Sequence, residues 1–232
     1  MKYQILVAGA ACLFATSASL ADEARISSKG DFGAYPLPSW HGPYIGAAIG
    51  FGEGSTDYYL DQDGHGADSN EASGLAGSIT AGYNWQRASG LVFGVEADVG
   101  FIDAAEEHPW KDGHSFQSDY GTWATLRARI GYAHNKFLFF ATGGLAYLEV
   151  DEVMLGANGG QNAGQTSHND DAHLGWVIGA GLEYAYSERV NLKLDYLHME
   201  FDEYKATTSA DLHYMFENEL DIVRVGFNYK LN

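Results

Sequence analysis

Charged side chains recur at alternate positions within otherwise apolar segments, and they are the first candidates for chemistry. Glu96 and Asp98 alternate with apolar residues in one segment, and Arg127 and Arg129 do so in the next. In an extended chain, alternate side chains lie on one face, so each segment has a charged face and an apolar face. The complete set of four acids and four bases is Glu96, Asp98, Arg127, Arg129, Glu183, Lys193, Asp195 and Arg224.

The balance of these eight charges indicates that their face is enclosed. A solvated face has no reason to balance its charges, whereas charges in a narrow interior need partners. We therefore predict that the acids and bases pair across neighbouring strands: Glu96 and Asp98 with the two arginines, and Glu183 with Lys193.

Histidines in polar stretches form a second candidate set. A histidine can bind haem iron or a transition metal. No pair has a recognisable ligand spacing, so solvent-exposed side chains without a ligand are the alternative reading. His198 and Glu200 share a face but no serine joins them, and we expect neither a catalytic site nor an enzyme. The low-ranked candidates for hemin or metal binding are His65, His108, His114, His168 and His213.

A repeat in the sequence predicts the strands that position these residues. Tyr83, Tyr132, Tyr184 and Tyr229 each close an alternating segment, at spacings of 49, 52 and 45 residues. A short polar turn follows each of the first three, and a long acidic stretch separates the segments in between. This rhythm predicts four consecutive β-hairpins, that is, an all-β fold of eight antiparallel strands in up-and-down order.

The positions of the aromatic residues favour a barrel in a membrane. Outward aromatics at the ends of the even-numbered segments would form one ring, and those at the ends of the odd-numbered segments a second ring at the opposite rim. Two aromatic rings at two heights are typical of transmembrane β-barrels with short periplasmic turns and long extracellular loops. One segment, 137–149, is apolar on both faces, which leaves its orientation open. The two rings comprise Trp85, Tyr132, Tyr184 and Tyr229, and Phe51 and Phe101.

The first 21 residues predict a secretory signal peptide. Lys2 precedes an apolar core, and small residues precede the expected cleavage after Ala21. The lone cysteine, Cys12, falls in this segment, so we expect no disulfide in the mature chain. The predicted domains are residues 1–21 as signal peptide, 22–40 as periplasmic lead, and 41–232 as barrel.

Acidity excludes one class of partner. The chain has 31 acidic and 13 basic residues, a net charge of −18, which becomes −19 without Lys2. Phosphate backbones are bound by clustered Lys and Arg, so we expect no nucleic-acid binding. The predicted loops, 53–73, 103–119, 151–172 and 202–219, carry most of the excess acid. Hydration of exposed loops explains this; divalent cations bridging the loops to lipopolysaccharide are the sharper hypothesis. The stretch DQDGHGADSNE superficially resembles a calcium loop, but its register is wrong, and we expect no resident metal or cofactor.

A resemblance to a known family is carried by the stretches ITAGYNWQ, VFGVEADVG, TLRARIGYAHNKFLFFATGGLAY, GWVIGAGLEYAYSERVNLKLDYLH and IVRVGFNYKL. They resemble the small alphaproteobacterial outer-membrane β-barrel family, which includes opacity-like surface antigens, porin-like members and hemin-binding members. The resemblance implies a barrel in the outer membrane of a Gram-negative cell, in contact with outer-membrane lipid and lipopolysaccharide and inserted by the barrel assembly machinery. The chain departs from such proteins at its end, where Leu231 stands in place of the usual terminal aromatic.

Two functions from different classes remain open at this point. The first is a structural and surface-exposed protein that supports the membrane and displays its loops as an antigen or adhesin. The second is a narrow porin or a hemin-binding uptake protein. Eight strands enclose a space that side chains can fill, which favours the first.

Overall fold

The computed structural model describes residues 38–60, 68–109, 115–155, 167–169, 172–202, 204–207 and 213–231. The chain divides into Met1–Pro36, which lies outside these ranges, and a unit from Leu37 to Asn232. The expected signal peptide and most of the expected lead therefore lie outside the described residues. Within the described ranges, no helix is long and apolar enough to cross a membrane.

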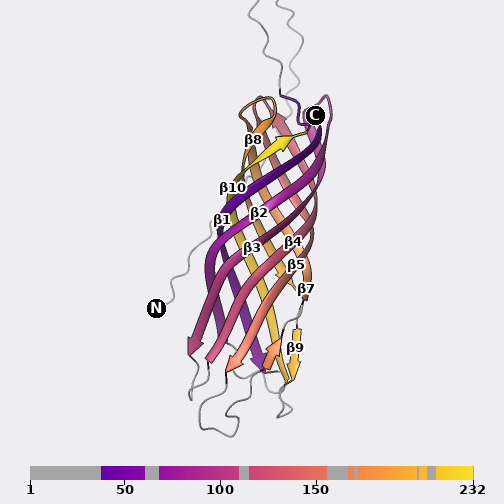
Figure 1. Ribbon diagram of the computed structural model, residues 1–232. Helices are drawn as coiled ribbons and strands as arrows, with labels where there is room; N and C mark the ends of the chain where they lie inside the picture. Colours follow the sequence, from indigo (N-terminus) through magenta and orange to yellow (C-terminus); the bar gives the residue numbers. More distant parts are fainter. Residues whose placement is uncertain are drawn as a thin grey trace, which may run out of the picture. The chain divides into compact units, whose positions relative to one another are not determined.

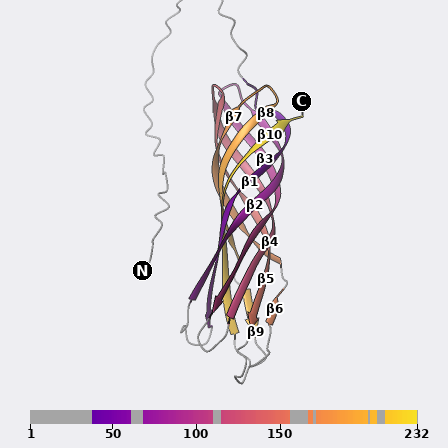
Figure 2. The same ribbon diagram turned by 60° about the vertical axis from the view of Figure 1, so that its left-hand side comes forward.

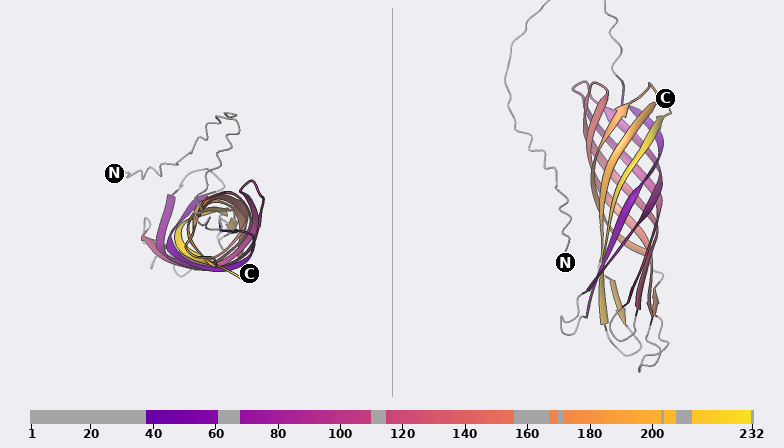
Figure 3. Two further views of the ribbon diagram at one scale, coloured as in Figure 1. Left: turned by 90° about the horizontal axis from the view of Figure 1, so that it is seen from above. Right: turned by 90° about the vertical axis from the view of Figure 1, so that its left-hand side faces the viewer.

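Eight long strands close into an antiparallel barrel, which confirms the predicted fold class (Figures 1 and 3). Each strand pairs with the next along the chain, and β1 closes the ring by pairing with β10. The end-on view in Figure 3 shows the closed ring. The strands are β1 (Gly42–Leu60), β2 (Asp68–Gln86), β3 (Leu91–Pro109), β4 (Ser115–His134), β5 (Phe137–Leu155), β7 (Ala172–Ala185), β8 (Val190–Phe201) and β10 (His213–Lys230).

The seams between strands differ in length. The closing seam runs from the pair Tyr44 and Lys230 to the pair Leu60 and Tyr214. The two seams of β8 are shorter, because this strand has only 12 residues. Its pairing with β7 begins at Phe201 and ends at Asn191.

Alternation sorts the side chains between the lumen and the outer face of the barrel. Apolar side chains on the outer face are exposed in all eight strands and form a continuous belt. The two orientations of β5 that the sequence left open are now resolved. Phe137 and Phe139 face outward, whereas Leu138, Phe140 and Leu148 are buried in the lumen. This strand is apolar on both faces because its inner face packs inside the barrel.

Tight turns join the strands at one end. His134 and Phe137 are paired, so the β4–β5 turn has two central residues, and Asn135 adopts a left-handed backbone (φ 54°) that asparagine tolerates. Gly90 (φ 86°) donates its N–H to Arg87 O at 3.0 Å in the β2–β3 turn. Ser187 Oγ accepts the N–H of Val190 at 3.0 Å in the β7–β8 turn.

At the opposite end the strands are longer than the sequence predicted. The expected loops began at 53, 103, 151 and 202, but β1 continues to Leu60, β3 to Pro109 and β5 to Leu155. The short strands β6 (Ser167–Asn169) and β9 (Tyr204–Thr207) add pairing to β5 and β10 there (Figure 2). The predicted loop boundaries were wrong because the outer face becomes polar there, for example at Glu53 and Asp103, although burial of the inner face and backbone pairing continue.

Candidate functional site

The eight charges predicted to balance one another lie inside the barrel. They come from β3, β4, β7, β8 and β10, and each side chain is at least 96 % buried. Their placement follows from strand parity, because each alternates with outward-facing apolar residues along its own strand. We refer to Glu96, Asp98, Arg127, Arg129, Glu183, Lys193, Asp195 and Arg224 as the lumen charge network.

Glu96 is the acid with the most cationic neighbours. Arg127 Nη2 donates to Glu96 Oε1 at 2.5 Å, and Arg129 Nη1 donates to Oε2 at 3.3 Å. Lys193 Nζ approaches Oε1 at 3.3 Å from the far side of the barrel. The Tyr44 hydroxyl donates to Oε2 at 2.7 Å. Protein groups thus bind both carboxylate oxygens, as a buried charge requires.

Asp98 links the arginines of two non-adjacent strands. Arg127 Nη2 donates to its Oδ2, and Arg224 Nη1 donates to Oδ1 at 3.0 Å. Thr80 and Thr125 add hydroxyl donors at 2.5 Å and 3.3 Å. Since these groups come from β2, β3, β4 and β10, the carboxylate ties the barrel together across its interior.

The remaining ion pairs differ in part from the prediction. Glu183 and Lys193 are register partners on β7 and β8. However, Glu183 Oε1 accepts from Arg129 Nη2 at 2.6 Å, and Lys193 Nζ lies 3.3 Å from Asp195 Oδ2. The predicted Glu183–Lys193 pair is therefore wrong, because long side chains in a narrow lumen reach across it. Arg224 binds Asp195 through two parallel hydrogen bonds of 2.9 Å.

An apolar layer lies on the side of the network away from the tight turns. Trp123 is fully buried, and its ring lies 5.5 Å from the Arg224 guanidinium carbon. A Cβ on Gly100 would lie 2.4 Å from this ring, so only glycine admits the indole there. Above it, Thr56 Oγ1 lies 2.7 Å from the Tyr120 hydroxyl and donates to Asn218 Oδ1 at 2.8 Å. The layer also contains Ile102, Leu148, Val177, Leu197, Met199, Phe201, Leu220 and Ile222.

Trp40 covers the side of the network that faces the tight turns. Its side chain is 2 % exposed and packs with Val92, Leu138 and Ala185. The backbone N–H of Trp40 donates to Gln86 Oε1 at 2.7 Å. The expected lead, 22–40, therefore ends inside the barrel mouth. We call this the Trp40 cap.

Sequence reasoning did not single out Trp40, Tyr44, Tyr120 or Trp123. Tyr44 shares the parity of the inward glycines and alanines of its strand, and Trp123 shares that of Arg127. The alternation of inward and outward residues along each strand was therefore the signal that could have identified Tyr44 and Trp123. No comparable signal identifies Trp40, which precedes the first strand.

The aromatic residues expected at the rims lie on the outer face. Phe51 and Phe101 are exposed on the side away from the tight turns, and Trp85, Tyr132 and Tyr229 near the turns. Tyr184 is half-buried, with its ring centroid 5.1 Å from that of Phe137.

The histidine candidates are only partly covered by the structure. His65 and His114 lie outside the described residues. His108, His168 and His213 belong to β3, β6 and β10 rather than to loops, because pairing extends beyond the predicted boundaries. Among the described residues, no three His, Cys, Asp or Glu side chains form a group that could hold a metal ion.

Acidic side chains ring the outer face above the apolar belt. Asp221 Oδ1 accepts from the Tyr196 hydroxyl at 2.6 Å and lies 2.8 Å from His198 Nδ1. Partial burial, together with nearby Asp221, Glu200 and Asp57, raises the pKa of the Glu219 carboxyl, while His198 opposes this rise. We call this ring the acidic collar; it comprises Glu53, Asp57, Glu71, Asp103, Glu149, Glu200, Asp202, Glu219 and Asp221.

Comparisons with known proteins agree with this architecture. The 31 kDa outer-membrane immunogenic protein of Brucella melitensis is 32% identical over 243 residues, which cover 97% of this chain and 98% of that protein. The 22 kDa outer membrane protein of Rhizobium leguminosarum bv. viciae is 28% identical over 72% of this chain and 66% of its own length. The structure of the outer membrane protein OprG from Pseudomonas aeruginosa matches the fold with a TM-score of 0.50 at 16% identity, covering 82% of this chain and 97% of that one. Residues 8–217 match the family model of the outer membrane protein beta-barrel domain, and the chain belongs to that family of outer-membrane proteins.

Proposed function

We propose that this outer-membrane barrel is a closed structural protein that displays its extracellular end at the cell surface, and that residues 1–21 are removed as a signal peptide. The observation that carries the proposal is the filled lumen. The Trp40 cap, the lumen charge network and the apolar layer lie one above another along the strands. Water and ions have no continuous polar path through such a stack, because buried charges are already paired and the apolar layer repels ions.

The surface role is supported by the extension of the strands beyond the apolar belt. The acidic collar and the paired ends of β1, β3 and β5 stand clear of the hydrocarbon region. Relatives named as immunogenic outer-membrane proteins are consistent with an exposed extracellular end.

Conductance of the refolded mature protein in a planar bilayer tests the closed lumen. We expect no discrete current steps from protein whose unheated gel mobility shows that it is folded. A porin reconstituted in the same bilayer serves as the control. Regular steps would refute the closed barrel and favour the narrow-porin alternative.

Cysteine labelling in intact cells tests the surface role separately. Glu71 in the acidic collar and Arg87 in the β2–β3 turn are both exposed, at opposite ends of β2. With a membrane-impermeant maleimide, Glu71→Cys should react in intact cells and Arg87→Cys only after lysis. Reaction of Arg87→Cys alone in intact cells would invert the proposed orientation.

A further inference from the structure

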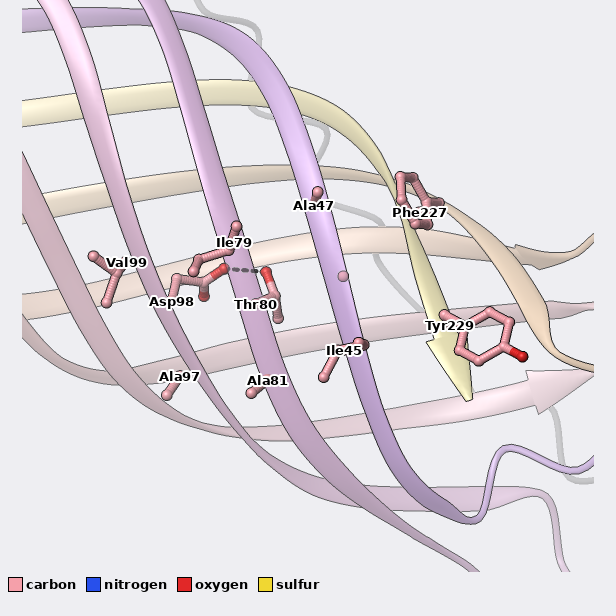
Figure 4. Close-up of a pocket in the computed structure, with 11 residues that line it drawn as sticks. Ile45, Ala47, Ile79, Thr80, Ala81, Ala97, Asp98, Val99, Phe227 and Tyr229 are labelled. Atoms are coloured by element: carbon pink, nitrogen blue, oxygen red, sulfur yellow. Dashed lines mark hydrogen bonds between the residues drawn. The ribbon is translucent and has the colours of Figure 1, made fainter. Parts of the chain in front are cut away.

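The lipid-facing wall is hollowed on the side where the barrel closes. A groove of about 670 Å³ crosses β10, β1, β2 and β3. Figure 4 shows residues that line it, with Ala47, Ala81 and Ala97 on three neighbouring strands. Thr80 and Asp98, which also border it, hydrogen-bond to each other as part of the lumen charge network. The groove is hollow because small residues occupy three adjacent strands: Ala81 and Ala97 are register partners, and Ala47 is the partner of Ile79. The larger lining residues are Ile45, Ile79, Val99, Phe227 and Tyr229.

A second groove of about 630 Å³ lies on the other side of Phe227. It crosses β1, β10, β8 and β7, and Leu182, Leu192 and Leu194 contribute to its walls. Both grooves include Phe227 and its register partner Ala47. Phe227 is therefore a ridge between two apolar channels on the membrane face.

A cationic group lies at the periplasmic end of this ridge. Tyr229 follows Phe227 on the same outward face, and Arg189 Nη1 donates to its hydroxyl at 3.4 Å. Arg189 is exposed in the β7–β8 turn. Glu188 precedes it and is the acidic neighbour of this group. From the periplasmic rim toward the membrane, the Arg189 guanidinium is therefore followed by the Tyr229 hydroxyl and then by Phe227, with one groove on each side of it.

We propose that this surface binds one anionic phospholipid of the periplasmic leaflet, with an acyl chain in each groove and the phosphate on Arg189 and Tyr229. The proposal rests on the outer-membrane location and goes beyond the closed-lumen function. Lipid tails already surround the wall, so burial of apolar area provides no driving force, and van der Waals fit to the grooves does. A guanidinium fork matches phosphate oxygens, and a hydroxyl beside it can donate a further hydrogen bond. The negative headgroup is attracted by Arg189 and repelled by the acidic collar at the opposite end of the barrel.

Native mass spectrometry of the refolded full mature chain provides the test. Protein is extracted from vesicles of phosphatidylcholine mixed with phosphatidylglycerol, and the lipid that remains bound is identified. We expect one retained phospholipid, with phosphatidylglycerol preferred. Arg189→Gln should weaken that preference about fivefold, as expected for one exposed charge interaction.

Two further variants separate the headgroup from the grooves. Ala47→Leu, which fills the floor shared by both grooves, should reduce retention of both lipids. Arg87→Gln removes a cation of the same rim away from the grooves and should leave retention unchanged. Equal retention of the two lipids by the wild-type protein, or an unchanged preference in Arg189→Gln, would overturn the proposal. Unheated gel mobility verifies the folding of each variant, so that loss of lipid is not loss of the barrel.

Discussion

Removing one arginine from the lumen should show how strongly the charge network supports the barrel. Arg127 donates to both Glu96 and Asp98, and all three side chains are buried. Arg127→Gln changes the network from four acids and four bases to four acids and three bases. Removing one partner of a buried ion pair typically costs about 3–5 kcal/mol, because it leaves a charge uncompensated.

The remaining contacts place the expected cost at the lower end of this range. Glu96 keeps Arg129 and Lys193, each at 3.3 Å. Asp98 keeps Arg224 at 3.0 Å and a threonine hydroxyl at 2.5 Å. We therefore expect Arg127→Gln to lower the free energy of unfolding by about 3 kcal/mol.

A second variant tests whether charge, rather than packing, causes the loss. Adding Asp98→Asn to Arg127→Gln restores equal numbers of acids and bases. We expect the double variant to lose only about 1–2 kcal/mol, the size of one or two neutral hydrogen bonds. Arg87→Gln, at an exposed turn, should stay within about 0.5 kcal/mol of the wild type.

Reversible urea unfolding in lipid vesicles, followed by tryptophan fluorescence, measures these differences. Gel mobility of unheated samples gives an independent measure of the folded fraction. A single variant as stable as the wild type would refute the network as a stabilising element. A double variant no more stable than the single variant would assign the loss to packing.

Three further predictions concern other parts of the molecule. Trp40→Ala should destabilise the barrel by about 3–5 kcal/mol, the usual cost of truncating a buried tryptophan. The variant should still pass no current across a planar bilayer, because the network and the apolar layer remain. Current steps would show that the Trp40 cap alone blocks ions. Because the folded-state pKa of Glu219 is raised, its protonation should stabilise the barrel at acidic pH, and this stabilisation should disappear as the pH rises through the raised pKa. Glu219→Gln should flatten this part of the pH profile of unfolding, and an unchanged profile would contradict the prediction. Replacing His65, His108, His114, His168 and His213 together by glutamine should weaken any hemin binding measured by the Soret absorbance, and equal binding would remove these histidines as ligands.

The sequence predicted the membrane-spanning part of the fold closely, because the two faces of each strand meet different surroundings there. Lipid on one side and a lumen on the other impose strict alternation, which placed Glu96 and Arg127 on the same face as the structure does. The orientation of β5 could not be predicted, because Leu138 and Phe140 are as apolar as their outward neighbours.

Partner choice within the lumen was less predictable than position. Strand register makes Glu183 and Lys193 neighbours, yet each binds a group from another strand. In a narrow lumen, long side chains have several partners within reach, and the selected set depends on all of them together. The Trp40 cap also escaped prediction, because its partners Val92, Leu138 and Ala185 are distant in the sequence.

The unequal seams have a mechanical consequence. Strand β8 is the shortest of the eight, and both of its seams are short, whereas the closing seam of β1 and β10 runs from Tyr44 to Leu60. Backbone hydrogen bonds along a seam break in sequence when two strands are peeled apart, so a shorter seam yields after less extension. A pulled or laterally strained barrel should therefore split beside β8, and the junction of the two chain ends should hold.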